Sequence, residues 1–237
     1  MNEPYINDEC VVLKRIPLNE NDAIIVFLGS KMGKIRTFSK GLGKPSSKLS
    51  ALLSVGNVVS VNLFEGKAGY TLLSATQSMV APRGSQSYET LLTKVYLCDL
   101  VDEGLMPDLQ EREIFDLIVN VINNIDDRNF VESRLYFEWR FLYFLGYVSD
   151  SRDDFYAMWR VYWKITDFSV RQTSMVDEMY TVLSYNIVSG KSFCGIQLSK
   201  DARKELSAFL SLMYKKHVGT QIKSKRILDE ATIHFYS

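Results

Sequence analysis

The first eighty residues alternate between short apolar runs and turn residues. Val59, Val61 and Leu63 alternate with Ser60 and Asn62, which is the period of a half-buried antiparallel strand. Clusters of Gly, Asn, Asp and Pro separate the runs. The pattern predicts strands at 11–13, 23–28, 34–38, 58–64 and 70–73. Five or so short strands with no long helix favour a small closed barrel of the OB type over a sandwich.

The pattern changes near residues 82–85, after which apolar residues recur every three or four positions. This helical period predicts a bundle, with Gly146 ending one helix and Ser199 capping the start of another. Residues 150–174 show no clear period. The predicted helices lie at 91–100, 114–122, 131–145, 175–188 and 199–216. We therefore predict a two-domain α+β protein, with an OB-fold nucleic-acid-binding domain at 1–80 and a helical domain at 81–237.

The charges are unevenly distributed, although Lys and Arg total 28 and Asp and Glu total 28. Residues 1–80 carry nine basic and six acidic side chains, and residues 181–237 carry nine and four. Residues 81–180 carry ten and eighteen. The net charge of zero therefore averages two basic terminal segments with an acidic central segment. The electrostatic field at a surface depends on the charges near it and not on the net charge.

One basic segment without any acid runs from residue 31 to residue 48. Lys34 and Arg36 share one face of a predicted strand, and Ile35 and Thr37 take the other. Glycines 41 and 43 would allow a phosphate backbone to approach closely. A solvated lysine face on an ordinary barrel is the alternative interpretation. The predicted DNA contacts in this segment are Lys31, Lys34, Arg36, Lys40, Lys44 and Lys48.

Two aromatic residues, Phe38 and Tyr70, are candidates to stack on bases, because single strands bind through cationic tracks and aromatic faces. Phe38 taken by itself fits the barrel core better than a stacking platform.

A second basic group lies near the end of the chain. It could simply complement the dipole of a helix C-terminus, or it could form a second contact with DNA or a partner. The candidates there are Lys215, Lys216, Lys223, Lys225 and Arg226, with His217 beside them.

Three stretches in register resemble the RecO family of recombination mediators. The first comprises Val12-Leu13-Lys14-Arg15, Asn19-Glu20-Asn21-Asp22, Gly33-Lys34-Ile35-Arg36, Ser39-Lys40-Gly41 and Ser46-Ser47-Lys48-Leu49. The second is Phe141-Leu142-Tyr143-Phe144-Leu145-Gly146-Tyr147, and the third is His217-Val218-Gly219 followed by Ile222-Lys223-Ser224-Lys225-Arg226-Ile227-Leu228. Lys14 and Arg15, in the first motif, complete the predicted DNA-binding set. The resemblance spans nearly the whole chain.

The cysteines depart from the pattern of many family members, which carry a four-cysteine zinc site. Cys194 is the only cysteine in the second half of this chain, and Cys10 and Cys98 lie far from it. A closed structural zinc site needs four ligands, so we predict a zinc-free variant with no metal and no cofactor. Thiols so far apart are expected to be buried or idle.

Motifs of the common catalytic sites are missing from the sequence. Residues 29–35 resemble a P-loop, but the glycines are one residue too close and Ile35 replaces the hydroxyl that binds magnesium. No GxSxG, HExxH or EF-hand loop occurs. The chain is therefore predicted not to be an enzyme. An enzyme whose catalytic site is assembled from residues distant in the sequence is a third hypothesis.

The resemblance implies a protein that binds single-stranded DNA, promotes annealing and assists RecA loading onto DNA coated with single-stranded-DNA-binding protein. It implies RecR and the acidic tail of single-stranded-DNA-binding protein as partners, with duplex DNA as an open alternative substrate. A second hypothesis is a protein–protein adaptor with a vestigial barrel, favoured by the acidic middle. With no apolar run long enough to cross a bilayer and no signal-peptide pattern, we expect a cytoplasmic protein without membrane contact.

Overall fold

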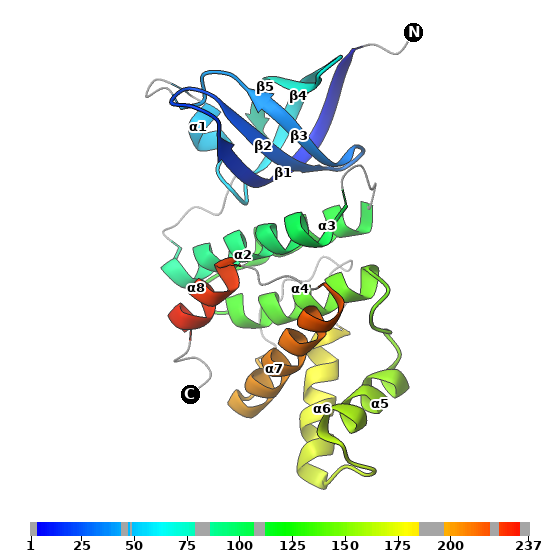
Figure 1. Cartoon of the computed structure of the whole chain (residues 1–237). Coiled ribbons are helices and arrows are strands. Elements are labelled where there is room, and N and C mark those ends of the chain that lie inside the picture. Colours follow the sequence, from blue (N-terminus) through cyan, green and yellow to red (C-terminus); the bar gives the residue numbers. More distant parts are fainter. Residues whose placement is uncertain are drawn as a thin grey trace. The chain divides into compact units, whose positions relative to one another are not determined.

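The structure is a computed structural model that describes residues 4–43, 47, 49–78, 86–106, 112–184, 197–218 and 223–232, without the side chain of Lys223. A β-rich first third is followed by helices (Figure 1), which confirms the predicted α+β class. The elements are β1 (Tyr5–Pro17), β2 (Ala23–Gly29), β3 (Gly33–Ser39), α1 (Leu49–Leu52), β4 (Val58–Gly66), β5 (Gly69–Gln77), α2 (Tyr88–Gly104), α3 (Arg112–Asn124), α4 (Phe130–Phe144), α5 (Arg152–Trp163), α6 (Val170–Leu183), α7 (Lys200–His217) and α8 (Lys223–Thr232).

The five strands close into a barrel in the order β1-β2-β3-β5-β4. β1 pairs antiparallel with both β2 and β4, and the closing pair of β3 with β5 is parallel. This is the topology of an OB-fold, a five-stranded Greek-key barrel. The prediction of an OB-type barrel is confirmed.

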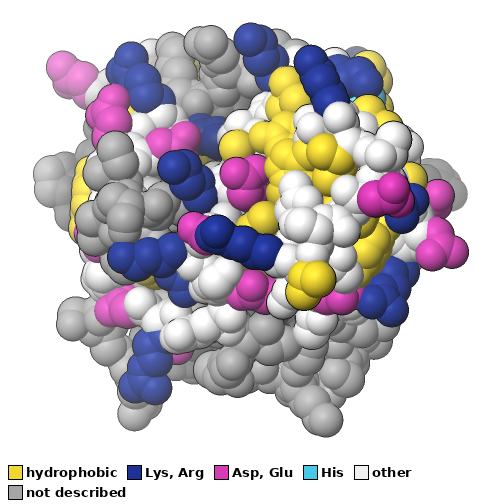
Figure 2. Space-filling model, turned by 90° about the horizontal axis from the view of Figure 1, so that it is seen from below, with side chains coloured by type: hydrophobic (Ala, Val, Ile, Leu, Met, Phe, Trp, Pro, Cys, Tyr) yellow, Lys and Arg dark blue, Asp and Glu magenta, His cyan; other side chains and the backbone are white. Residues whose placement is uncertain are grey.

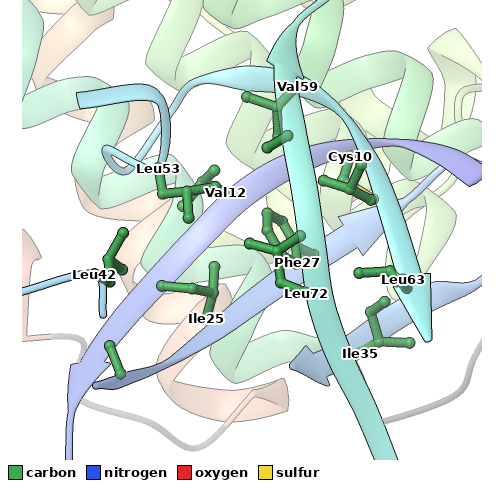
Figure 3. Close-up of a cluster of buried hydrophobic side chains, with 13 residues drawn as sticks. Cys10, Val12, Ile25, Phe27, Ile35, Leu42, Leu53, Val59, Leu63 and Leu72 are labelled. Atoms are coloured by element: carbon green, nitrogen blue, oxygen red, sulfur yellow. The ribbon is translucent and has the colours of Figure 1, made fainter. Parts of the chain in front are cut away.

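The barrel interior is filled by apolar side chains from all five strands, as Figure 3 shows. Side chains of a strand alternate between its two faces, and in β2 and β4 every second residue reaches this core: Ala23, Ile25 and Phe27, and Val59, Val61 and Leu63. Leu42 and Leu53, from the loop after β3 and the end of α1, join the same cluster. The alternation visible in the sequence therefore specifies the inside of the barrel.

Part of the outer face of the barrel is also buried. Val11, Val26 and Leu28 are fully buried, although they alternate with the core residues of β1 and β2. The barrel and the segment Lys94–Asn123, which holds most of α2 and α3, form one compact unit. The barrel thus has an apolar layer outside as well as inside. The domain boundary after residue 80 stays a prediction.

The second compact unit consists of Gln86–Thr93 and Asn124–Ser237. α4 is buried on most sides, as predicted for the aromatic segment 131–145. Its Trp139 meets the ring of Phe155 on α5 edge-on at 5.0 Å between centroids. On α5, Trp159 stacks on Phe209 of α7 at 4.8 Å. Aromatic packing therefore joins α4, α5 and α7 into a bundle.

Two predicted helix ends are confirmed. The hydroxyl of Ser199 accepts a hydrogen bond from the N–H of Ala202, as a helix N-cap does. Gly146 follows α4 with a φ of 77°, and its N–H donates to the carbonyl of Tyr143. α6 begins five residues earlier than predicted, and α5 lies in the segment for which no element was predicted. Among the described helices, none has the length and apolarity needed to cross a bilayer.

Candidate nucleic-acid interface

Three side chains on the outward face of β3 and just beyond it form the main candidate site. Arg36, Phe38 and Lys40 are exposed, whereas the intervening Ile35, Thr37 and Ser39 are buried. Alternate residues of a strand lie about 7 Å apart on one face. The order of cation, aromatic ring and cation matches what single-stranded nucleic acid requires of a binding groove. We refer to Arg36, Phe38 and Lys40 as the β3 stripe.

Phe38 has 37% of its surface exposed, so the expectation that it belongs to the barrel core is wrong. Its backbone pairs with Thr71 across the parallel β3–β5 contact, and with Ile24 on the other side. Tyr70 is different, because its half-buried ring packs against the barrel core and its hydroxyl donates to Glu65 at 3.4 Å. Of the two predicted stacking residues, Phe38 offers the more accessible ring.

Lys31 lies in the tight turn between β2 and β3, with its side chain exposed. The buried carboxylate of Asp8 holds this turn. It accepts hydrogen bonds from the Ser30 hydroxyl at 2.6 Å and from the N–H groups of Lys31 and Met32, both at 3.1 Å. The backbone that carries Lys31 is therefore fixed, while the ammonium group is exposed.

Lys14 and Lys34, both predicted to contact DNA, are occupied inside the protein. The ammonium group of Lys14 is 3.0 Å from the carboxylate of Asp102 on α2 and 3.6 Å from that of Glu103. Lys34 is buried; its ammonium group lies 3.2 Å from the Asp102 carboxylate and donates to the carbonyl oxygens of Asp102 and Leu105. Lys34 shares a strand face with Arg36, as predicted, but that end of the face is covered.

Electrostatics around Asp102 agree with this geometry. Burial by itself would raise the pKa of the Asp102 carboxyl, but hydrogen bonds and charge from Lys14 and Lys34 outweigh it, and the pKa lies below its ordinary value. The pKa of Lys14 is raised, chiefly by its hydrogen bond to Asp102. Asp102 and Lys14 thus remain charged at neutral pH. The contacts of Asp102 with Lys14 and Lys34 join α2 to β1 and β3.

Arg15 also makes contacts inside the barrel unit. Its backbone pairs with Ile25, a core residue of β2. The guanidinium group donates to the hydroxyl of Ser50 at 3.0 Å and to the carbonyl of Leu42 at 3.4 Å. Arg15 therefore ties β1 to α1 and to the loop after β3, which is a structural role the sequence did not indicate.

The loop after β3 carries Lys40 and is anchored by the loop between β1 and β2. The N–H of Gly41 donates to the carboxylate of Asp22, and that of Gly43 to the carbonyl of Asn21, both at 2.8 Å. A Cβ atom at Gly43 would lie 2.1 Å from the Glu20 carbonyl oxygen. Position 43 must therefore be glycine because the Glu20 backbone packs against it. This corrects the prediction that Gly43 allows a phosphate backbone to approach. Lys44 and Lys48 lie outside the described residues.

The C-terminal cations divide in the same way. Lys215 and Lys216 are exposed in the last turn of α7, where the helix-dipole interpretation applies equally well. Arg226 has an 84% exposed side chain. The ammonium group of Lys225 donates to the Ser211 hydroxyl at 2.9 Å and lies 3.9 Å from the carboxylate of Glu138. Lys225 therefore attaches α8 to its own unit, and the side chain of Lys223 lies outside the described residues.

Figure 2 shows one face of the molecule, on which Lys and Arg side chains are interspersed with Asp and Glu. Apolar side chains gather in a band on the same face. Over the described residues of this face, the Lys and Arg side chains form no continuous basic patch.

Cys10 and Cys98 are buried free thiols, as expected. Burial raises the pKa of both thiols well above the ordinary value, which keeps them protonated. Cys194 lies outside the described residues. No group of three His, Cys, Asp or Glu side chains within the described ranges is arranged to hold a metal ion.

Comparison with known proteins decides the family. The model of the recombination protein O N-terminal region matches residues 1–81, and that of the C-terminal region matches residues 85–155. Together they cover well over half of the chain. The chain belongs to the RecO family. This confirms the resemblance carried by the first two motifs, and it agrees with the prediction that the protein is not an enzyme. The third motif, at residues 217–228, lies beyond the residues that the two family models match.

Several bacterial proteins named DNA repair protein RecO are similar in sequence. That of Frankia casuarinae is 37% identical over 82 residues, which are 35% of this chain and 33% of that protein. That of Clostridium acetobutylicum is 30% identical over 144 residues, 58% of this chain and 56% of that protein. That of Dehalococcoides mccartyi is 26% identical over 157 residues, 65% and 61%. The matched regions thus span from one third to under two thirds of these RecO proteins.

Proposed function

We propose that this RecO family protein binds single-stranded DNA through the β3 stripe and promotes annealing of complementary strands. Arg36 and Lys40 would contact phosphates, and Phe38 would stack on a base between them. Stacking of one base on an aromatic side chain contributes about 1–3 kcal/mol. The observation that carries the proposal is the exposed alternation of cation, ring and cation on an OB barrel.

The proposal extends to a role in recombination. The protein would assist RecA loading onto DNA coated with single-stranded-DNA-binding protein, with RecR as a partner in the cytoplasm. The acidic tail of single-stranded-DNA-binding protein would dock on the helical part, since acidic segments are recognised by basic clusters. Family membership supports these roles. Lys31, Lys44, Lys48, Lys215, Lys216, Lys223 and Arg226 stay candidate DNA contacts.

A strand-annealing assay tests the main proposal with the charge reversals Arg36→Glu and Lys40→Glu. Both should slow annealing and weaken oligonucleotide binding, because each replaces a phosphate contact with repulsion. Lys44→Glu belongs in the same series. The matched control is Lys204→Glu, which makes the same charge change at an exposed position on α7 and should leave annealing unchanged.

The alternative function is an adaptor with a vestigial barrel. The internal contacts of Lys14, Arg15 and Lys34 favour it, because they remove three cations from the possible DNA surface. If Arg36→Glu and Lys40→Glu anneal DNA as fast as the unmodified protein while RecR binding persists, the adaptor is the better account.

A further inference from the structure

The loop between β1 and β2 is stabilised by its own polar side chains. The side-chain oxygen of Asn19 accepts the N–H groups of Asn21 and Asp22, both at 2.8 Å, and its amide donates to the Asp22 carboxylate at 3.1 Å. The N–H of Leu18 donates to the carbonyl of Asp22 at 2.9 Å. Asn and Asp side chains stabilise turns in this way. Asp22 is thereby held in one place.

The second oxygen of the Asp22 carboxylate faces the neighbouring loop and accepts the N–H of Gly41. Gly41 has a φ of 71°, a backbone conformation that glycine adopts readily. The pairing of β2 with β3 ends at Ser39 opposite Ala23. Beyond that pair, the contacts of Gly41 and Gly43 with the β1–β2 loop hold the backbone that carries Lys40.

We propose that Asp22 is a positioning residue for DNA binding, because its carboxylate fixes the backbone at Gly41 and so holds Lys40 in line with Arg36 and Phe38. This inference rests on the proposed binding of single-stranded DNA by the β3 stripe. An ammonium group on an ordered backbone contacts a phosphate with less loss of conformational entropy than one on a loose loop.

The proposal predicts an effect opposite to that of simple electrostatics. A carboxylate beside a cationic surface repels phosphate, so its removal alone should strengthen DNA binding. If Asp22 acts by positioning, Asp22→Ala weakens binding instead. Loss of one phosphate contact with a single strand should lower the affinity about fivefold at 0.1 M salt. It should also make the slope of log association constant against log salt concentration less steep by about 0.7.

The experiment measures binding of the full chain to a labelled oligothymidylate by fluorescence anisotropy over a range of salt. Asp22→Ala should bind about fivefold more weakly at 0.1 M salt. Asp22→Asn keeps an oxygen that can accept the Gly41 N–H and should bind at least as tightly as the unmodified protein. Glu20→Gln removes the neighbouring exposed negative charge and serves as the matched control, with unchanged or tighter binding.

A double-mutant cycle separates positioning from a general loss of structure. In a Lys40→Ala background, Asp22→Ala should cause no further weakening, because the two changes remove the same contact. If Asp22→Ala does not fold, Gly43→Ala tests the same contact between the β1–β2 loop and the loop after β3. The Cβ added at position 43 would clash with the Glu20 carbonyl oxygen. Gly43→Ala should reproduce the fivefold loss.

The outcomes distinguish the inference from the proposed function. If the unmodified protein does not bind the oligonucleotide, the proposed function fails. If it binds, and Asp22→Ala and Gly43→Ala bind equally well or more tightly, the positioning role is wrong. Equal weakening by Asp22→Ala with and without Lys40 would also overturn it.

Discussion

Phe38 distinguishes the β3 stripe from an ordinary basic surface, because it adds an exposed aromatic ring to the two cations. It lies between Arg36 and Lys40 on the outward face of the strand. Cations alone attract any phosphate backbone, single or double. An exposed ring adds a contact that only an unpaired base can make, because the faces of bases in a duplex are already stacked. Phe38 should therefore confer preference for single strands.

Replacement of Phe38 by Ala tests this preference. Binding to a single-stranded oligonucleotide should weaken by about 1–3 kcal/mol, the stacking contribution of one base, while binding to a duplex of the same length should be unchanged. Parallel anisotropy titrations with both DNAs provide the measurement. An equal loss for single and double strands would indicate that the ring does not stack on a base.

At the scale of elements, the contact of α2 with β1 and β3 depends on one carboxylate. Asp102 receives the ammonium groups of Lys14 and Lys34, and removal of one partner of a buried ion pair costs about 3–5 kcal/mol. The lowered pKa of Asp102 stabilises the folded state above the unfolded-state pKa. That stabilisation is lost as the pH falls through the lower, folded-state pKa.

Asp102→Asn should therefore lower the free energy of unfolding at neutral pH and leave less of it to be lost in acid. The difference between the two proteins should shrink as the pH falls below about 4, the pKa of an ordinary Asp carboxyl. Urea unfolding at a series of pH values measures it. A difference that stays constant down to pH 2 would mean that Asp102 does not contribute through its charge.

The alternation of β4 predicted that Val59, Val61 and Leu63 lie on one face of the strand, and all three are in the barrel core. The alternation of β3 predicted that Lys34 and Arg36 lie on the face opposite Ile35. It could not predict that Lys34, on the same face, is covered. That outcome depends on Asp102, 68 residues further along the chain, and strand periodicity carries no information about such a distant contact. α5 escaped prediction because its aromatic residues occupy several sides of the helix, in contact with α4, α6 and α7.

For the whole molecule, a net charge of zero is compatible with DNA binding only if exposed cations gather locally. Lys31, Arg36 and Lys40 are exposed on the barrel unit, and Lys44 and Lys48 follow them in the sequence. Two of the acidic side chains near this surface make hydrogen bonds inside the protein: Asp8 holds the β2–β3 turn and Asp22 the loop after β3. Glu20 is exposed. A local basic surface can therefore exist in a neutral protein.

The salt dependence of binding to single-stranded DNA tests this account most directly. If the five cations of residues 31–48 other than Lys34 each neutralise one phosphate, the logarithm of the association constant should fall with the logarithm of salt concentration with a slope of about −3.5. Arg36→Ala and Lys40→Ala should each make the slope less steep by about 0.7. An affinity that does not change with salt, or a slope that neither variant alters, would contradict the account.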